Sequence, residues 1–238
     1  MSWTNKTTKF ATTILTLSIA GSAIAGTIVI RADGPSKAMY QPGKALTGRI
    51  ALKSGDTLVV LDGRGTRTLT GPASVDLSVA RTASAAPSAM TSLIRNAGAR
   101  QVRTGAVRGG NSVQASSPNL WYVDTTRGGK VCLPDTTQAT LWRKSMNEAA
   151  TLTLTRSSDR KAVPLNFAIG QSVRSWPVAE LPIAAATDYW LSGPGIPTPL
   201  VVRFEAIGNT ETTPDAVASA LMSKGCSHQL DMLVAAGT

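Results

Sequence analysis

The sequence predicts a mainly β protein with an N-terminal antiparallel β meander, a linker, and a β-sandwich-like domain that ends in short helices. Three observations lead to this prediction. Short runs of β-branched and other apolar residues alternate with turn residues in two separate regions. A segment rich in alanine, serine, glycine and arginine divides these regions, and sustained helical periodicity occurs at the end of the chain.

The N-terminal segment has the three parts of a secretory signal peptide. Lys6 and Lys9 form a basic start, residues 10–25 carry no charge, and Ala23-Ile24-Ala25 is a small-x-small cleavage site. The uncharged run continues to Ile30, so an uncleaved segment would be long enough to anchor the chain in the inner membrane. Both interpretations export the rest of the chain, because the lysines hold the N-terminus in the cytoplasm. We expect a periplasmic or extracellular protein that contacts the membrane only if residues 1–25 are retained.

The charge balance limits the partners of an exported chain. Residues 1–25 hold two lysines and no acidic residue, so cleavage lowers the formal net charge from +10 to +8. Export argues against DNA as a partner. A basic surface outside the cytoplasm suits an acidic envelope protein or an anionic envelope polymer.

The only two cysteines are Cys132 and Cys226. In an oxidising compartment an even number of cysteines predicts a disulfide. The alternative is a redox or zinc site, but the pair lacks the C-x-x-C spacing and His228 is the only histidine. We expect a structural bridge, no metal and no cofactor.

Residues 26–78 are expected to form the meander. Residues 36–48 contain Pro42 and Gly43 and predict a loop. The closely spaced turn signals that follow favour antiparallel hairpins over βαβ units. The expected strands are residues 27–30, 49–53, 57–61, 66–70 and 73–77.

Residues 79–118 form the expected linker. No acidic residue occurs between Asp76 and Asp124. Met90, Leu93 and Ile94 predict one short helix, and the remainder has the composition of a surface connection. The arginines that are candidates for anion binding are Arg95, Arg100, Arg103 and Arg108.

Residues 119–238 are expected to form the β-sandwich-like domain with its helical tail. Residues 120–123 and 130–133 flank an Arg-Gly-Gly turn and predict a hairpin. Further strands are expected at residues 139–143, 150–156, 163–168, 172–176, 188–191 and 200–207. The large core residues of these strands would be Trp142, Trp176, Tyr189 and Trp190.

Two helices are expected at the end of the chain. Thr213 is a candidate N-cap, Pro214 suits the first helical position, and Lys224-Gly225 signals a stop. A second helix would begin at Ser227, directly after Cys226. A disulfide from Cys226 to Cys132 would fix this tail to the second β region.

The sequence around two candidate sites argues against a phosphate-binding loop and against a catalytic pair of carboxylates. Gly63-Arg64-Gly65 lacks the third glycine and the helix that a dinucleotide-binding loop requires. Asp56 and Asp62 are candidates for an acid/base pair, but each adjoins a turn glycine, where aspartate bonds to backbone amides. We expect turn roles for both.

Nucleophilic catalysis has little support. Ser158-Asp159-Arg160-Lys161 matches S-x-x-K, but the accompanying S-D-N and K-T-G motifs do not occur. The stretch lies between two β runs and predicts a hairpin turn. His228 would have to serve a Ser/His/Asp site without any motif around it. We therefore assign no catalytic residue.

Residues 31–72 combine an early strand, Tyr40-x-Pro-Gly-Lys, the string LKSGDTL and a glycine-turned hairpin that ends at Gly71-Pro72. This stretch resembles the periplasmic β domain of FecR-type proteins. The resemblance covers about a fifth of the chain. It implies a module that senses or presents an interaction outside the membrane, in some members during iron-uptake signalling.

These observations predict a non-enzymatic envelope protein that binds, scaffolds or senses. Two alternatives remain open. One is an envelope hydrolase that acts on cell-wall or lipid substrates, and the other is a polyanion binder that uses the segment from Arg95 to Arg108.

Overall fold

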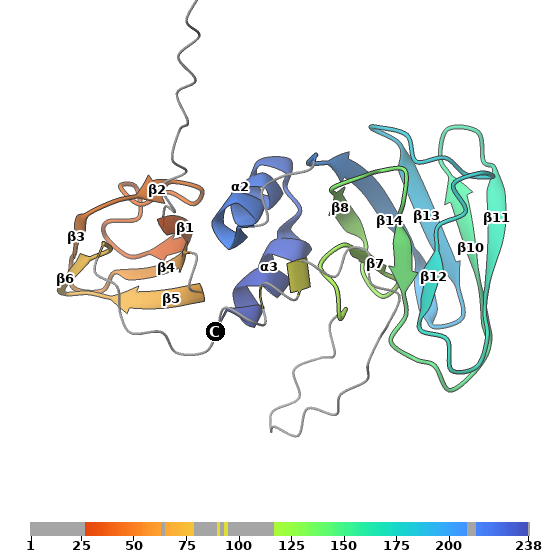
Figure 1. Ribbon diagram of the computed structural model, residues 1–238, viewed down its shortest axis with the longest axis horizontal. Coiled ribbons are helices and arrows are strands. Elements are labelled where there is room, and N and C mark those ends of the chain that lie inside the picture. The colour runs from red at the N-terminus through yellow and green to blue at the C-terminus, as the bar shows by residue number, and fades with distance from the viewer. Residues whose placement is uncertain are drawn as a thin grey trace, which may run out of the picture.

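The computed structural model describes residues 27–62, 65–78, 90, 93–94, 117–208 and 213–237. It confirms a mainly β protein with several sheets and two short C-terminal helices. Figure 1 shows a small first β unit (residues 27–62 and 65–78) and a larger second β unit (residues 117–208), with the two helices between them. Within the described residues, no helix has the length and apolar character needed to cross a membrane.

The first β unit is built entirely from antiparallel pairs. Its larger sheet has the order β2-β1-β4-β5, and β3 pairs with β6 in a second sheet. A small apolar cluster that includes Val29, Tyr40 and Leu58 fills the unit. The strands are β1 (Thr27–Asp33), β2 (Ala45–Leu46), β3 (Arg49–Leu52), β4 (Thr57–Asp62), β5 (Gly65–Thr70) and β6 (Ala73–Asp76).

The pairing in this unit departs from a simple meander, because β3 joins β6 and not its neighbour β4. The turn that contains Gly71 explains this arrangement. Its amide donates to the Asp56 carbonyl, and a Cβ on Gly71 would collide with the Lys53 carbonyl oxygen. Only glycine allows this approach, which places the chain after Gly71 alongside β3.

The second β unit contains a five-stranded sheet, β11-β10-β13-β14-β8, and a three-stranded sheet, β12-β9-β7. Both sheets contribute side chains to one core, which fits the expected sandwich-like architecture. The expected positions of β9 to β14 agree with the structure to within a few residues at each end. The strands are β7 (Tyr122–Asp124), β8 (Gly129–Leu133), β9 (Thr140–Trp142), β10 (Ala150–Arg156), β11 (Ala162–Phe167), β12 (Val173–Ser175), β13 (Asp188–Gly193) and β14 (Ile196–Ala206).

The hairpin predicted for residues 120–133 is wrong. β7 pairs in parallel with β9, and β8 pairs in parallel with β14, so the two strands belong to different sheets. Gly128 has a packing role instead of a hairpin role. A Cβ there would come within 2.9 Å of the Val201 carbonyl oxygen, so glycine lets the chain pass close to β14 before β8 begins.

Three aromatic rings form the centre of the second unit. Trp176, Tyr189 and Phe204 make edge-to-face contacts, with ring centroids 5.0–5.7 Å apart. Trp142 is also buried, as expected. Trp190 is not a core residue, because Tyr189 and Leu191 point inward and alternation along β13 turns Trp190 outward. There the Arg160 guanidinium lies 4.6 Å from the centroid of its ring.

The helices α2 (Pro214–Lys224) and α3 (Ser227–Ala236) occupy the predicted positions. Thr213 precedes α2 but forms no side-chain cap. Gly225 ends α2 with φ 74°, and the amide of Cys226 donates back to the Leu221 carbonyl. This turn places Cys226 beside β8, where it forms the predicted disulfide with Cys132.

The helices also pack against the first β unit, which the sequence did not predict. The amide of Thr66 on β5 donates to the Gly237 carbonyl over 3.0 Å, and its hydroxyl donates to the Val234 carbonyl over 3.0 Å. Leu61 of β4 belongs to the large core that the helices share with the second unit. Met90 and Ile94, the buried residues of the predicted linker helix, join the same core. The α2–α3 pair therefore connects the two β units.

Candidate functional site

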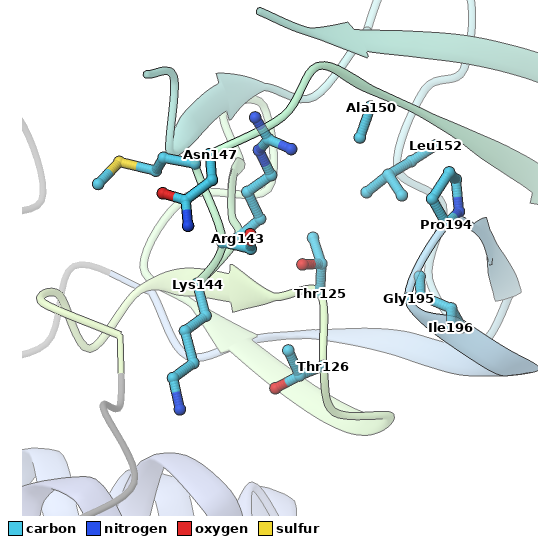
Figure 2. A pocket seen from close by; sticks show the side chains of 12 residues that line it. Thr125, Thr126, Arg143, Lys144, Asn147, Ala150, Leu152, Pro194, Gly195 and Ile196 are labelled. Carbon is cyan, nitrogen blue, oxygen red and sulfur yellow. The ribbon is translucent and has the colours of Figure 1, made fainter. Parts of the chain in front are cut away.

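A cleft of about 480 Å³ opens at one end of the second β unit. Figure 2 shows it between the chain that follows β7, the loop that follows β9, the start of β10 and the β13–β14 turn. Four segments far apart in the sequence thus meet in one place. The volume lies within the range of about 300–1,000 Å³ that small-molecule sites occupy.

The β13–β14 turn forms one wall of the cleft and has a clear sequence origin. Gly193 pairs with Ile196 across a two-residue turn, Pro194-Gly195. Proline presets the first turn position, and Gly195 adopts φ 79° at the second, as a type II turn requires. A Cβ on Gly193 would lie 2.8 Å from a Leu152 methyl carbon, so the turn sits close to β10.

Arg143 is the central residue of the opposite wall, and only 8% of its surface is exposed. Its Nε donates to the Gln171 carbonyl, and one Nη donates to the Glu148 and Ala168 carbonyls over 2.7 and 3.0 Å. The guanidinium also lies 5.1 Å from the centroid of the Phe167 ring. These contacts fix the side chain and tie together the loops that follow β9 and β11.

The hydrogen bonds of Arg143 leave its charge uncompensated. Carbonyl oxygens accept protons from the guanidinium but carry no net charge. Within the described part of the chain, neither Arg143 nor its neighbour Lys144 forms an ion pair with a carboxylate. Lys144 is exposed at the edge of the cleft. The wall therefore presents two cations and no carboxylate.

The two sides of the cleft differ in chemistry. Thr125, Arg143, Lys144 and Asn147 form a polar side, while Ala150, Leu152, Pro194 and Ile196 form an apolar side (Figure 2). The residues that line the cleft include no histidine, cysteine, aspartate or glutamate. This set can bind and orient a ligand, but it contains no group suited to general acid–base or thiol chemistry near neutral pH.

His228, the one candidate imidazole, lies outside the cleft. It is the second residue of α3, and its Nε2 is 4.0 Å from an Asp124 carboxylate oxygen, beyond hydrogen-bond distance. Burial lowers the pKa of His228 below its usual value; Arg127 lowers it further, while Asp124 and Asp231 oppose the shift. Its Nε2 is buried and has no hydrogen-bond partner among the described residues. A serine-type site needs a hydroxyl bonded to this nitrogen.

The two aspartates of the first unit are placed as turn residues. Asp56 accepts the amides of Ser36 and Lys53 over 2.8 and 2.6 Å. Burial raises the pKa of Asp56, but these hydrogen bonds outweigh burial and hold it below the usual range. Asp62 pairs with Arg67 across the β4–β5 hairpin at 2.6 Å. The residues between these strands, Gly63 and Arg64, lie outside the described residues.

The Ser158–Lys161 stretch forms the β10–β11 turn, as predicted. Asp159 accepts two hydrogen bonds from the Arg156 guanidinium. These bonds hold the pKa of Asp159 at about 2. Within the described residues no hydrogen bond joins the Ser158 hydroxyl to the Lys161 ammonium, and the amide of Lys161 donates to Asp159.

The remaining predicted residues divide into two groups. Cys132 and Cys226 form the disulfide, and the described residues contain no group of three or more histidine, cysteine or acidic side chains that could hold a metal. The arginines proposed for anion binding, Arg95, Arg100, Arg103 and Arg108, lie outside the described residues, as does the segment 1–25.

Sequence reasoning missed the cleft. Two signals pointed toward it: the basic pair Arg143-Lys144 directly after an apolar strand, and the Pro194-Gly195 turn. Neither signal shows that these segments meet, because their contact depends on strand pairing in the second unit.

The chain matches no known family, no curated protein and no solved structure. The resemblance of residues 31–72 to the FecR-type β domain therefore stays a prediction.

Proposed function

We propose that this protein is an exported, non-enzymatic binding protein of the cell envelope, and that the cleft of the second β unit is its binding site. The observation that carries the proposal is the chemistry of the cleft. Its lining provides uncompensated cations, hydrogen-bonding groups and an apolar side, but none of the acidic, imidazole or thiol side chains that a hydrolase would use.

The disulfide supports the exported location. Cys132 and Cys226 are both fully buried, and their bridge fastens the helical layer to β8. Structural disulfides form and persist in oxidising compartments and are rare in a reducing cytosol. This bridge agrees with the signal-peptide pattern of residues 1–25, so two independent features favour export.

The position of the first β unit supports a scaffolding role. The helices hold it against the second unit through Thr66, Leu61 and the end of α3. We propose that the first unit is a FecR-like module that presents a second contact surface at a fixed position relative to the cleft. It would add affinity for one partner by engaging two sites together.

Crosslinking in intact cells tests the proposal. The full chain, with its N-terminal segment, is expressed and treated with a membrane-impermeant lysine crosslinker, and the adducts are identified. We expect an N-terminus at Gly26, oxidised cysteines and a specific envelope partner. A reduced protein in the cytosol would refute export, and a purified oxidised protein that gives no adduct and no ligand would refute binding.

The hydrolase alternative has one candidate pair, Asp124 and His228. The purified protein is assayed against ester, peptidoglycan and phospholipid substrates, alongside His228→Gln. We expect no turnover above background from either protein. Turnover that is lost in His228→Gln, with an unchanged melting temperature, would replace the binding proposal with an enzyme.

The polyanion alternative depends on arginines outside the described residues. Retention on heparin at low salt is compared between the native chain and a variant with alanine at Arg95, Arg100, Arg103 and Arg108. Loss of retention in the variant would support this alternative, because phosphate- and sulfate-type contacts weaken with salt and cation number. Equal retention would exclude the segment as a binding site.

A further inference from the structure

We infer that the cleft binds a small anionic amphiphile, in which a carboxylate is joined to a short apolar group. This inference deepens the proposed binding function and rests on it. It is carried by the charge of one wall, the fixed position of Arg143, the apolar character of the other wall and the size of the space between them.

The charged residues that line the cleft indicate that its ligand is negatively charged. Arg143 and Lys144 line the cleft, no acidic side chain does, and neither cation has an ion-pair partner within the described ranges. A guanidinium that is this deeply buried is an effective partner for an anion, because little water screens it. A cationic ligand would meet two like charges.

The hydrogen-bond donors that remain free in the cleft indicate that the anionic group of the ligand is a carboxylate. Nε and one Nη of Arg143 are occupied by three backbone carbonyls, so the guanidinium offers a ligand only its second Nη and not the two-nitrogen fork that can bind a carboxylate or a phosphate. The second Nη of Arg143, the Lys144 ammonium and the Thr125 hydroxyl form no hydrogen bond with another described residue. These few donors suit a group with one charge and two oxygens.

The apolar residues on the other side of the cleft indicate that the ligand also carries an apolar group. Ala150, Leu152, Pro194 and Ile196 face the polar residues across it (Figure 2). Each methylene of a ligand buried on such a wall should tighten binding about fourfold. At about 480 Å³ the cleft has room for a chain of several carbons or one apolar side chain. A free short-chain acid and the C-terminus of a peptide both present this chemistry.

The wall is built before any ligand arrives. Arg143 is held by three hydrogen bonds and by the Phe167 ring, and the β13–β14 turn is fixed by its proline and by the contact of Gly193 with β10. Binding would therefore order few groups, which lowers its entropic cost.

Titration calorimetry on the oxidised full-length mature protein tests the inference. The probes are octanoate, octan-1-ol, octylammonium and acetate. We expect saturable binding of octanoate that weakens as salt rises, with the alcohol and acetate each at least tenfold weaker and no binding of octylammonium. Equal binding of octanoate and octan-1-ol, or no saturable binding of octanoate, would overturn the inference.

A matched pair of charge variants locates the binding. Lys144→Glu reverses the exposed cation of the cleft and should weaken octanoate about tenfold. Lys161→Glu makes the same change on the exposed β10–β11 turn, away from the cleft lining, and should leave the affinity unchanged. An equal loss of octanoate affinity in the two variants would show that binding depends only on the net charge of the protein and not on the cleft.

A third variant tests the apolar wall without disturbing Arg143. Ala150→Phe places a ring in the cleft and should abolish binding of octanoate, while circular dichroism confirms an unchanged fold. Full affinity in this variant would place the ligand elsewhere. Replacing Arg143 itself is less informative, because its hydrogen bonds hold two loops.

Two peptides separate the sources of the carboxylate. N-acetyl-Gly-Gly-Leu is compared with its C-terminal amide. Tighter binding of the acid than of octanoate would assign the site to a polypeptide C-terminus, and weaker binding would assign it to a free acid. If no carboxylate binds but the crosslinked partner depends on Lys144, the carboxylate inference fails while the proposed function stands. If neither is found, both fail.

Discussion

The two β units differ in the contacts that stabilise each of them internally. In the first unit every strand pair is antiparallel, and Tyr40 is the only aromatic residue of its buried cluster. In the second unit β7 pairs in parallel with β9, β8 pairs in parallel with the much later β14, and three aromatic rings fill the centre. Local turn chemistry thus accounts for much of the first unit, whereas long-range packing organises the second.

The comparison also shows that the first unit is not self-contained. One end of β4 contributes Leu61 to the core that the second unit shares with the helices, and β5 bonds to the end of α3. A small β unit buries a small fraction of its surface, so an added covering layer contributes much to its stability. We therefore expect changes in the helical layer to reach both units.

The largest effect is expected from removing the disulfide. The bridge joins residues 94 positions apart, and its loss in a Cys132→Ala/Cys226→Ala variant should lower the free energy of unfolding by about 2–5 kcal/mol. Urea unfolding followed by tryptophan fluorescence measures this loss. If the helices couple the units, both should unfold at lower urea. An unaltered unfolding curve would contradict a structural role for the bridge.

The next largest effect is expected at Gln229, a buried polar residue of α3. Its Oε1 accepts the Cys132 amide, and its Nε2 donates to the Leu120 and Cys132 carbonyls. Gln229→Ala leaves these buried groups unpaired and should cost about 2–3 kcal/mol in unfolding free energy. Gln138→Ala, at an exposed position, is the control and should stay within about 0.5 kcal/mol of the native protein.

A smaller effect is expected at the contact between the first unit and α3. Thr66→Val removes the hydroxyl that donates to the Val234 carbonyl and should cost about 1 kcal/mol. Thr68→Val, at an exposed position two residues along the same strand, serves as the matched control. Hydrogen exchange of β5 amides should rise in the Thr66 variant alone. Equal exchange in the two variants would show that the contact does not hold the units together.

The smallest effect is expected from the protonation of His228. Its pKa is lowered in the folded protein, so the unfolded state binds more protons as the pH falls through the unfolded value near 6.5. Stability should therefore fall on acidification across this value and level off once the folded imidazole is also protonated. Thermal melts from pH 8 to pH 5 should show a smaller fall for His228→Gln, and an identical fall would assign the pH dependence to other groups.

The accuracy of the sequence predictions follows the same division between local and long-range contacts. Turn residues placed most strands of both units and the β10–β11 turn correctly, but β2 (Ala45–Leu46) lies within residues 36–48, which were predicted to form a loop. The same reasoning failed at residues 120–133, because two strands beside a glycine turn need not pair with each other. The same reasoning did not predict that Gln229 is buried. Polar side chains are usually exposed, and only the structure shows the three backbone groups that form hydrogen bonds with this one.

The sequence alone determined the mainly β class, most strand positions, the two C-terminal helices and the cysteine pair, because propensity, alternation, turn residues and parity are local properties. Only the tertiary structure decided the parallel pairs, the helical layer between the units and the cleft with Arg143 and Lys144. These features bring together residues that are distant in the chain, and the free energy that selects them comes from packing and hydrogen bonding across the whole fold.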